Sequence, residues 1–232
     1  MDYSSPAMLR IRSLGRRLGV FPPLVRTFRK LIGTRYEERF DGALAAAIRP
    51  GDTVWDVGAN LGLYTEKFAN QVGPAGHVAA FEPSPRNVVK LRARFPESRS
   101  VTVLPIALGD QPGTATFYSN QSADGTTDSL MPRVQGAVPI NVPIHQGDEF
   151  LARHPPNVIK IDVEGFELEA VRGMRKTLAS PNLRSVLIEV HFGILSDRGI
   201  QDAPAQLAAL LKDCGLAVSW VDASHLIGMR AA

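Results

Sequence analysis

The chain has 232 residues, of which 44% are hydrophobic and 21% are charged, and its formal net charge is +3. These proportions are near those of soluble globular domains, and they exclude a chain that is mainly disordered. No run of 18 apolar residues occurs, which excludes a membrane-spanning helix, and the length fits one α/β domain with a leader. The single cysteine, Cys214, cannot form an internal disulfide, so we expect a reducing, cytoplasmic setting.

Residues 1–35 form a basic segment, which we call the leader. It carries eight lysines and arginines against one acid, Asp2, and its apolar residues predict two short amphipathic helices broken by Pro22 and Pro23. Such a segment can bind anionic lipid headgroups at the inner membrane surface, or the phosphates of a nucleic acid. The alternative is a leader that packs on the domain with its arginines in solvent. We divide the chain into this leader and a domain at residues 36–232.

The first half of the domain shows alternating helix and strand patterns. Apolar residues recur at four-residue spacing from Tyr36 to Ile48, which is typical of an amphipathic helix, and Ser84 with Pro85 supplies a helix cap and a first-turn proline. The predicted elements are a helix at 36–48, a strand at 53–57, a helix reaching residue 68, a strand at 77–81, a helix from residue 84 and a strand at 101–107. This order predicts one half of a doubly wound α/β sheet.

The pattern changes between residues 109 and 148, where we predict a β-hairpin insertion. Its strands are expected at 114–118 and 138–144, separated by a polar loop at 119–136. The loop either contacts substrate or is a disordered excursion on the surface. Alternation then resumes with a strand at 158–162, a helix at 166–178, a strand at 185–190, a helix from 202 to 215, and strands at 216–221 and 225–229. The last two strands are joined too tightly for a crossover, so they must be antiparallel.

The first strand runs into a small turn that is typical of a nucleotide pocket. Asp56 ends the strand, and the turn is Gly58, Ala59, Asn60, Leu61 and Gly62. The two glycines are spaced G-x-x-x-G, whereas a dinucleotide pyrophosphate requires G-x-G-x-x-G, which argues against a nicotinamide-dependent oxidoreductase. Asp56 would repel a pyrophosphate but attract the ammonium and sulfonium charges of S-adenosylmethionine. We therefore predict that Asp56, Gly58, Ala59, Asn60 and Gly62 bind this cofactor.

The next two strands add cofactor candidates. Glu82, followed by Pro83, ends the second strand 26 residues after Asp56, where nucleotide-binding folds place the acid that binds the ribose diol. An isolated glutamate at this place is more often a helix cap, but the preceding turn favours ribose binding. Ala107, at the end of the third strand, is a candidate floor under the adenine.

A second cluster of polar residues follows the apolar strands at 158–162 and 185–190. Lys160, Asp162 and Glu164 share one face by the two-residue period, and we expect Lys160 to form an ion pair inside the sheet. Asp162 and Glu164 would open onto the pocket that Asp56 lines, because the fourth strand lies beside the first in this fold. Glu189 and His191 come to the same rim, and the gathering of these groups favours a functional role.

These residues resemble the FkbM family of S-adenosylmethionine-dependent methyltransferases. The resemblance covers roughly residues 50–189 and rests on three runs: Asp56 to Asn60, Phe81 to Pro83, and Lys160 to Gly165 after a β-rich insertion. It implies a Rossmann-like seven-stranded sheet whose last strand is antiparallel, in agreement with the tight pair at the C-terminal end. It also implies O-methylation of a hydroxyl on a sugar or a secondary metabolite, and the basic leader adds a glycolipid as a candidate acceptor. The leader lies outside the resemblance.

The chemistry of O-methylation suggests roles for the second cluster. The acceptor hydroxyl needs a base, for which His191 or Asp162 is the candidate, with Glu164 and Glu189 orienting the acceptor or the base; Asp162 is also a cofactor candidate. If a metal such as Mg²⁺ takes part, Asp162, Glu164 and Glu189 would hold it. An RNA methyltransferase or an RNA-binding protein that uses the leader is an alternative, but no aromatic stacking motif supports nucleic acid binding. The sequence leaves the oligomeric state open.

Overall fold

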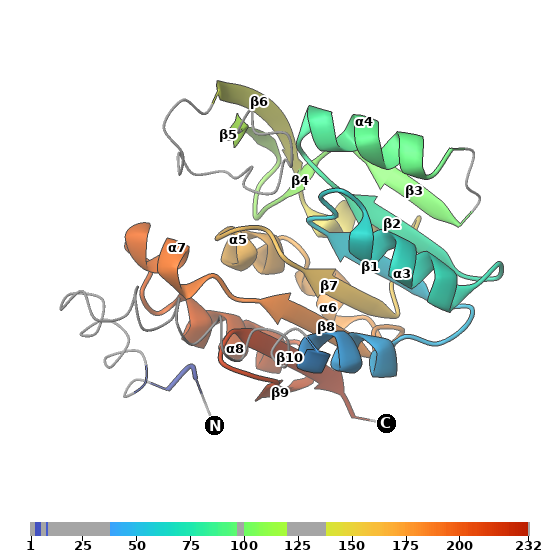
Figure 1. Ribbon diagram of the computed structural model, residues 1–232. Helices are drawn as coiled ribbons and strands as arrows, with labels where there is room; N and C mark the ends of the chain where they lie inside the picture. The colour runs from blue at the N-terminus through green and yellow to red at the C-terminus, as the bar shows by residue number, and fades with distance from the viewer. Residues whose placement is uncertain (1–2, 6–7, 9–37, 97–99, 120–137, 232) are drawn as a thin grey trace.

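The computed structural model of the chain describes residues 3–5, 8, 38–96, 100–119 and 138–231 (Figure 1). The predictions for the leader and for the insertion loop therefore lie almost entirely outside the described residues. One leader residue that is described, Tyr3, packs edge-on against Trp220 with 5.8 Å between ring centroids. Among the described residues, none of the helices is both long and apolar enough to cross a membrane.

The central element is a seven-stranded sheet in the order β3-β2-β1-β7-β8-β10-β9. All neighbouring strands pair in parallel except β10, which is antiparallel to both β8 and β9. The strands are β1 (Thr53–Val57), β2 (His77–Phe81), β3 (Val101–Leu104), β7 (Val158–Ile161), β8 (Ser185–Glu189), β9 (Leu216–Trp220) and β10 (His225–Arg230). The predicted fold is thus confirmed, including the antiparallel last strand and the placement of β7 beside β1.

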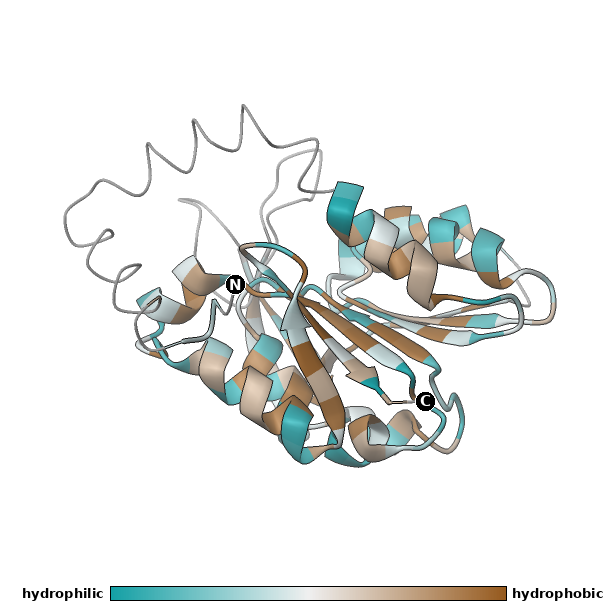
Figure 2. Ribbon diagram, turned by 90° about the horizontal axis from the view of Figure 1, so that it is seen from below, coloured by the Kyte–Doolittle hydropathy of each residue, from teal (hydrophilic) through white to brown (hydrophobic). Residues whose placement is uncertain are grey.

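Helices cover both faces of this sheet, and adjacent residues of each strand supply the two cores. Val54 packs with the helix at residues 38–47 and with α3 and α4, whereas Trp55 packs with α5, α6 and α8. The helices are α3 (Leu63–Val72), α4 (Pro85–Arg94), α5 (Glu167–Arg172), α6 (Arg175–Ala179), α7 (Phe192–Asp197) and α8 (Ala203–Asp213). Figure 2 shows hydrophobic residues concentrated along the strands, with hydrophilic residues on the outer faces of the helices.

A small second sheet, in the order β4-β6-β5, stands beside the main one. Its strands are β4 (Ala107–Leu108), β5 (Gly113–Ser119) and β6 (Val138–His145), and β5 and β6 form the predicted antiparallel hairpin. The prediction that the third strand reaches Ala107 is wrong. The strand ends at Leu104 because Pro105 has no N–H for the ladder, and Ala107 then pairs with Ile144 of the second sheet.

The prediction of a single helix at 166–178 is also wrong, because the structure has two short helices there. Gly173 ends α5 and lies so close to the hairpin that a Cβ on it would be 1.8 Å from the carbonyl oxygen of Gly109. A new helix, α6, begins after Met174, and its first N–H groups are capped by Asp148, whose carboxylate accepts hydrogen bonds from Lys176 N (3.1 Å) and Thr177 N (2.8 Å). A contact with a distant segment therefore overrides the local helical pattern.

Candidate active site

The turn after β1 contacts the carboxyl ends of both neighbouring strands, β2 and β7. The N–H groups of Gly58 and Ala59 both donate to the carbonyl oxygen of Phe81 at 3.0 Å. Gly58 has a φ of +82°, and a Cβ on it would lie 1.9 Å from the carbonyl oxygen of Asp162. Only glycine fits this position, since any side chain would collide with the backbone at the tip of β7. The predicted cofactor turn and the predicted catalytic segment are thus in direct backbone contact.

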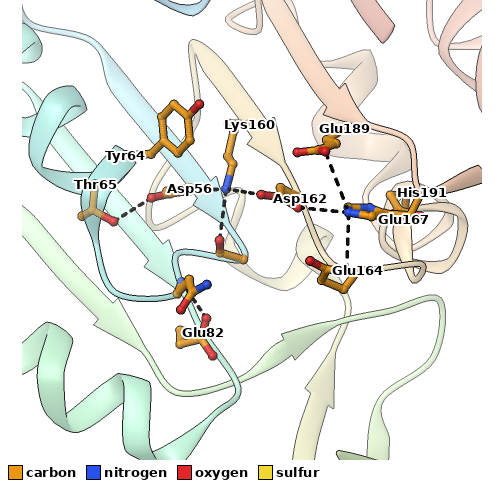
Figure 3. A network of polar contacts seen from close by, with 12 residues as sticks. Asp56, Tyr64, Thr65, Glu82, Lys160, Asp162, Glu164, Glu167, Glu189 and His191 are labelled. Carbon is orange, nitrogen blue, oxygen red and sulfur yellow. Dashed lines mark hydrogen bonds and ion pairs between the residues drawn. The ribbon is translucent and has the colours of Figure 1, made fainter. Parts of the chain in front are cut away.

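Asp56 faces into the protein. Its carboxylate is 0% exposed, accepts a hydrogen bond from Thr65 Oγ1 (2.6 Å) and pairs with Lys160 Nζ (3.2 Å), as Figure 3 shows. Lys160 also donates to the carbonyl oxygen of Gly58 (3.0 Å) and lies 3.6 Å from Asp162 Oδ2. Burial alone would lower the pKa of Lys160, but the charges of Asp56 and Asp162 raise it, so this side chain stays cationic.

These contacts correct one prediction and agree with another. The expected ion pair of Lys160 is present. The expected direct contact between Asp56 and a cationic cofactor does not match the structure, because the carboxylate has no exposed surface and already has a cation beside it. Asp56 and Val54 lie on the same face of β1 by the two-residue period, which turns the carboxylate under α3.

Glu82 links the turn to the end of β2. Its Oε2 accepts a hydrogen bond from Asn60 N (2.7 Å), and its Oε1 accepts one from Ser84 N (2.8 Å). Asn87 Nδ2 in turn donates to Asn60 Oδ1 (3.1 Å), which helps to hold Asn60 at its φ of +50°. Glu82 is thus at the end of β2 as the sequence predicts. Its role in ribose binding, and those of Pro83 and Ala107 in the pocket, stay predictions.

Three of the predicted residues gather around the imidazole of a fourth, His191, at the tips of β7 and β8 (Figure 3). His191 Nε2 lies 3.5 Å from Glu164 Oε2, 3.8 Å from Asp162 Oδ1 and 4.0 Å from Glu189 Oε1. The carboxylates of Asp162, Glu164 and Glu189 are 28%, 32% and 29% exposed. The cluster is therefore open to a ligand. Glu164 has a φ of +51°, so the segment after β7 turns sharply at this point.

The other ring nitrogen of His191 is held from inside the protein. Its Nδ1 donates to Oε1 of Glu167 at 2.7 Å, and the same oxygen accepts a hydrogen bond from Gly165 N (2.8 Å). Glu167 has no place among the site residues predicted from the sequence, and the structure buries it completely. Glu167 is therefore a member of the site that sequence reasoning missed.

The charges around His191 determine its protonation state. Burial lowers the pKa of His191, but the hydrogen bond to Glu167 and the charges of Glu167, Glu164 and Asp162 together raise it to about 9. Burial raises the pKa of Glu189, but His225, His191 and Lys160 together lower it to about 2. Near neutral pH the imidazole is therefore a cation among carboxylates, and it has no free nitrogen with which to accept a proton.

Two further residues border the cluster without having been predicted. Tyr64 of α3 donates its hydroxyl to Asp41 Oδ1 (2.7 Å), and Lys160 Nζ lies 5.2 Å from the centre of its ring. Burial and the neighbouring acids raise the pKa of Tyr64, so its hydroxyl keeps its proton. His225 of β10 lies on the far side of Glu189, with 3.8 Å between Nε2 and Oε2. No local pattern marks either residue, because both are brought here by the fold.

The same groups include a candidate donor set for a metal ion. One ligand atom each from Asp162, Glu164 and His191 lies within 4.8 Å of the others. The sequence named Glu189 as the third ligand, and the structure puts an imidazole nitrogen in the middle of the acids instead. Mg²⁺ prefers oxygen ligands, and here a protonated ring occupies the space between them. The donor set therefore fits Mg²⁺ poorly.

Comparison with known proteins agrees with the fold. Residues 56–216 match the family model for the methyltransferase FkbM domain. The hexuronic acid methyltransferase AglP of Haloferax volcanii is 32% identical over 148 residues, which are 62% of this chain and 57% of that protein. The 31-O-demethyl-FK506 methyltransferase FkbM of Streptomyces tacrolimicus is 28% identical over 204 residues, 74% of this chain and 75% of that protein.

A solved structure shows the same architecture. The methyltransferase FkbM of Methylobacillus flagellatus aligns with 77% of this chain and 43% of its own, at a TM-score of 0.51 and 16% identity. The sheet order and the position of the candidate site at its carboxyl edge define an α/β domain of the doubly wound class. The chain belongs to the FkbM methyltransferase family, because the family model covers more than half of it. The chain spans 57% of AglP, so the substrates of whole relatives are not transferred to it directly.

Proposed function

We propose that this chain transfers a methyl group from S-adenosylmethionine to a hydroxyl oxygen of a sugar, a glycolipid or a secondary metabolite. The observation that carries the proposal is the open cluster of Asp162, Glu164, Glu189 and His191, in backbone contact with the turn at Gly58. The two relatives named above act on a hexuronic acid and on 31-O-demethyl-FK506, according to their names. Membership in this family favours methyl transfer over the nicotinamide-dependent alternative.

The residues at the site suit a cationic methyl donor. When bound, S-adenosylmethionine supplies a methyl group that is already activated by its sulfonium charge. Three partly exposed carboxylates face the same opening and attract that charge. The turn from Gly58 to Gly62 lets the donor approach the backbone, and Glu82, at the end of β2, is the proposed ribose ligand.

We assign the proton transfer to Asp162. The acceptor oxygen forms a bond to the methyl carbon, the bond from that carbon to sulfur breaks with its electron pair going to sulfur, and the hydroxyl proton passes to a carboxylate oxygen of Asp162. His191 is already protonated, so it holds the carboxylates in place rather than accepting the proton. Such a base typically contributes about 10²- to 10⁴-fold to the rate. Glu164 and Glu189 orient the acceptor, and no step is assigned to Mg²⁺.

The test combines binding with turnover. Calorimetry should detect S-adenosylhomocysteine binding and no NADH binding to the full chain. Mass spectrometry should then detect the addition of one methyl group to a hydroxyl in a panel containing p-nitrophenyl glucuronide, p-nitrophenyl glucoside and a hydroxylated macrolide. Well-folded protein that binds NADH but not S-adenosylhomocysteine would contradict the proposal.

A further inference from the structure

A second histidine stands behind the cluster on the antiparallel strand β10. His225 lies directly opposite Glu189 in the β10–β8 ladder, and its side chain is 4% exposed. Its Nε2 is 3.8 Å from Glu189 Oε2, while the other oxygen of that carboxylate is 4.0 Å from His191 Nε2. Glu189 therefore spans two imidazoles, one in the open cluster and one in the interior.

The imidazole of His225 is held by a hydrogen bond to Asp222 and by stacking on Phe40. Asp222 Oδ2 accepts a hydrogen bond from its Nδ1 at 2.7 Å, and Asp222 Oδ1 accepts from the backbone N–H groups of Ser224 (2.9 Å) and His225 (3.0 Å). The ring of Phe40, from the helix at residues 38–47, stacks on the imidazole with 4.0 Å between centroids and 19° between planes. These contacts leave Nε2 aimed at Glu189.

We infer that His225, oriented by Asp222 and Phe40, is a positioning residue that holds the Glu189 carboxylate in place for the acceptor. The inference rests on the proposed methyl transfer and adds a residue that touches neither donor nor acceptor. Glu189 is 29% exposed, and a glutamate side chain that reaches into solvent loses rotamer freedom when it is fixed. Because His225 holds Glu189 from the interior, the glutamate loses this rotamer freedom before the acceptor binds. The carboxylate is then held in a single productive orientation.

The charges around His225 agree with this role. Asp222 and Glu189 face the ring from the β9–β10 turn and from β8, and Asp41 of the helix at residues 38–47 also feels its charge. Burial lowers the pKa of His225, but the hydrogen bond to Asp222 and the charges of Asp222 and Glu189 raise it to about 9. Both ring nitrogens therefore carry protons near neutral pH, and Nε2 presents a positive donor to Glu189.

The test compares two variants with a matched control in the full chain. His225→Gln removes the cation, and Asp222→Asn keeps the Oδ1 acceptor for the turn while it removes the carboxylate that orients the ring. The control is His154→Gln, because His154 stacks on His77 at the opposite, amino end of the strands (5.0 Å, 8°). Turnover is measured with the best acceptor of the panel above, and S-adenosylhomocysteine affinity is measured by calorimetry.

We expect His225→Gln and Asp222→Asn to lower kcat by about 10- to 100-fold with S-adenosylhomocysteine affinity unchanged, and the control to leave both as they are. In a Glu189→Gln background, His225→Gln should cause little further loss, because its effect passes through that carboxylate. If His225→Gln does not fold, the kcat and the S-adenosylhomocysteine affinity of Asp222→Asn test the inference instead.

Two outcomes overturn the inference, and they are distinguishable. The inference alone is overturned if the folded variants keep the kcat of the unsubstituted chain. It is also overturned if their losses of kcat add fully to the loss in Glu189→Gln. An unsubstituted chain that neither binds S-adenosylhomocysteine nor methylates any acceptor of the panel overturns the proposed function and the inference with it.

Discussion

Lys160 and Asp56 form a buried ion pair across the two parallel strands at the centre of the sheet. They are register partners in β7 and β1, and their Nζ and Oδ1 atoms are 3.2 Å apart. The lysine also binds the carbonyl oxygen of Gly58 and approaches Asp162, so it joins the turn after β1 to the tip of β7. One cation thus supports both the proposed donor side and the proposed acceptor side of the site.

Replacing one partner of this pair should destabilise the protein strongly. Lys160→Met leaves Asp56 as a buried, uncompensated charge, and we expect the free energy of unfolding to fall by about 3–5 kcal/mol in urea denaturation. The control is Lys67→Met, which breaks the exposed pair between Lys67 and Asp41 (2.7 Å) and should cost less than about 1 kcal/mol. Equal losses in the two variants would show that burial of the Lys160 pair is unimportant.

Gly58→Ala should be far more harmful than a glycine substitution with the same backbone conformation elsewhere. The new Cβ would lie 1.9 Å from the carbonyl oxygen of Asp162 and would push the two strand tips apart. Gly51 has a φ of +84°, and a Cβ added to it would have no atom within 4 Å, so Gly51→Ala tests backbone strain alone, at about 1 kcal/mol. Thermal unfolding and S-adenosylhomocysteine binding measure the difference. Comparable behaviour of the two variants would refute the steric argument.

The proton acceptor can be identified from the dependence of turnover on pH. We expect Asp162→Asn to lower kcat by about 10²- to 10⁴-fold, and turnover of the unsubstituted chain to fall above pH about 9, as His191 loses its proton. If His191 were instead the base, turnover would rise with pH over that range. Initial rates across the pH range, with folding checked at each pH, separate the two assignments.

Stability should fall over the same alkaline range. The folded-state pKa values of His191 and His225, both about 9, lie above the ordinary value of 6.5. Their stabilising contribution is therefore complete below pH about 6.5 and is lost as pH rises through about 9. We expect a loss on the order of 3 kcal/mol for each histidine between these limits, which urea denaturation measures. The decline should be shallower in His225→Gln, and an unchanged slope would contradict these pKa values.

Removal of divalent metal should leave methyl transfer intact. The site places the protonated ring of His191 between the carboxylates that would bind Mg²⁺, and the proposed transfer uses Asp162 directly. Turnover after dialysis against EDTA should equal turnover with added Mg²⁺. Loss of activity on dialysis, with recovery on adding Mg²⁺, would show that a cation displaces the proton from this cluster.

Binding of anionic lipid through its eight lysines and arginines is one of the roles that the sequence leaves open for the leader, beside packing on the domain. The full chain should co-sediment with phosphatidylglycerol vesicles at low salt and be released as salt increases, because the attraction is electrostatic. The matched control has all eight basic residues replaced by serine and should stay in the supernatant. Co-sedimentation of this control, or none by the unsubstituted chain, would leave the leader without a role at membranes.

The sequence predicts the strand tips well because their signals are local. Apolar runs that end in an acid place Glu82, Asp162 and Glu189 at one edge once the strands are parallel. The inward orientation of Asp56 could also have been foreseen, since it shares its strand face with Val54 and a threonine follows at Thr65.

Other features depend on contacts that no local pattern contains. His225 reaches Glu189 only because β10 inserts between β8 and β9, and the sequence predicts a tight strand pair without giving its position in the sheet. The break in the helix at Gly173 arises from its close approach to Gly109. The protonated state of His191 follows from its distances to Asp162, Glu164 and Glu167, which follow β7, and those distances are a property of the fold.

The hairpin of β5 and β6 pairs with β4 and with itself, and no strand of the main sheet hydrogen-bonds to it among the described residues. The main sheet can therefore keep its hydrogen bonds while the hairpin changes in length or composition. The sequence leaves open whether the loop between these strands contacts the substrate, and chimeras that exchange residues 109–145 between relatives test this, because a change of acceptor preference would follow only if it does.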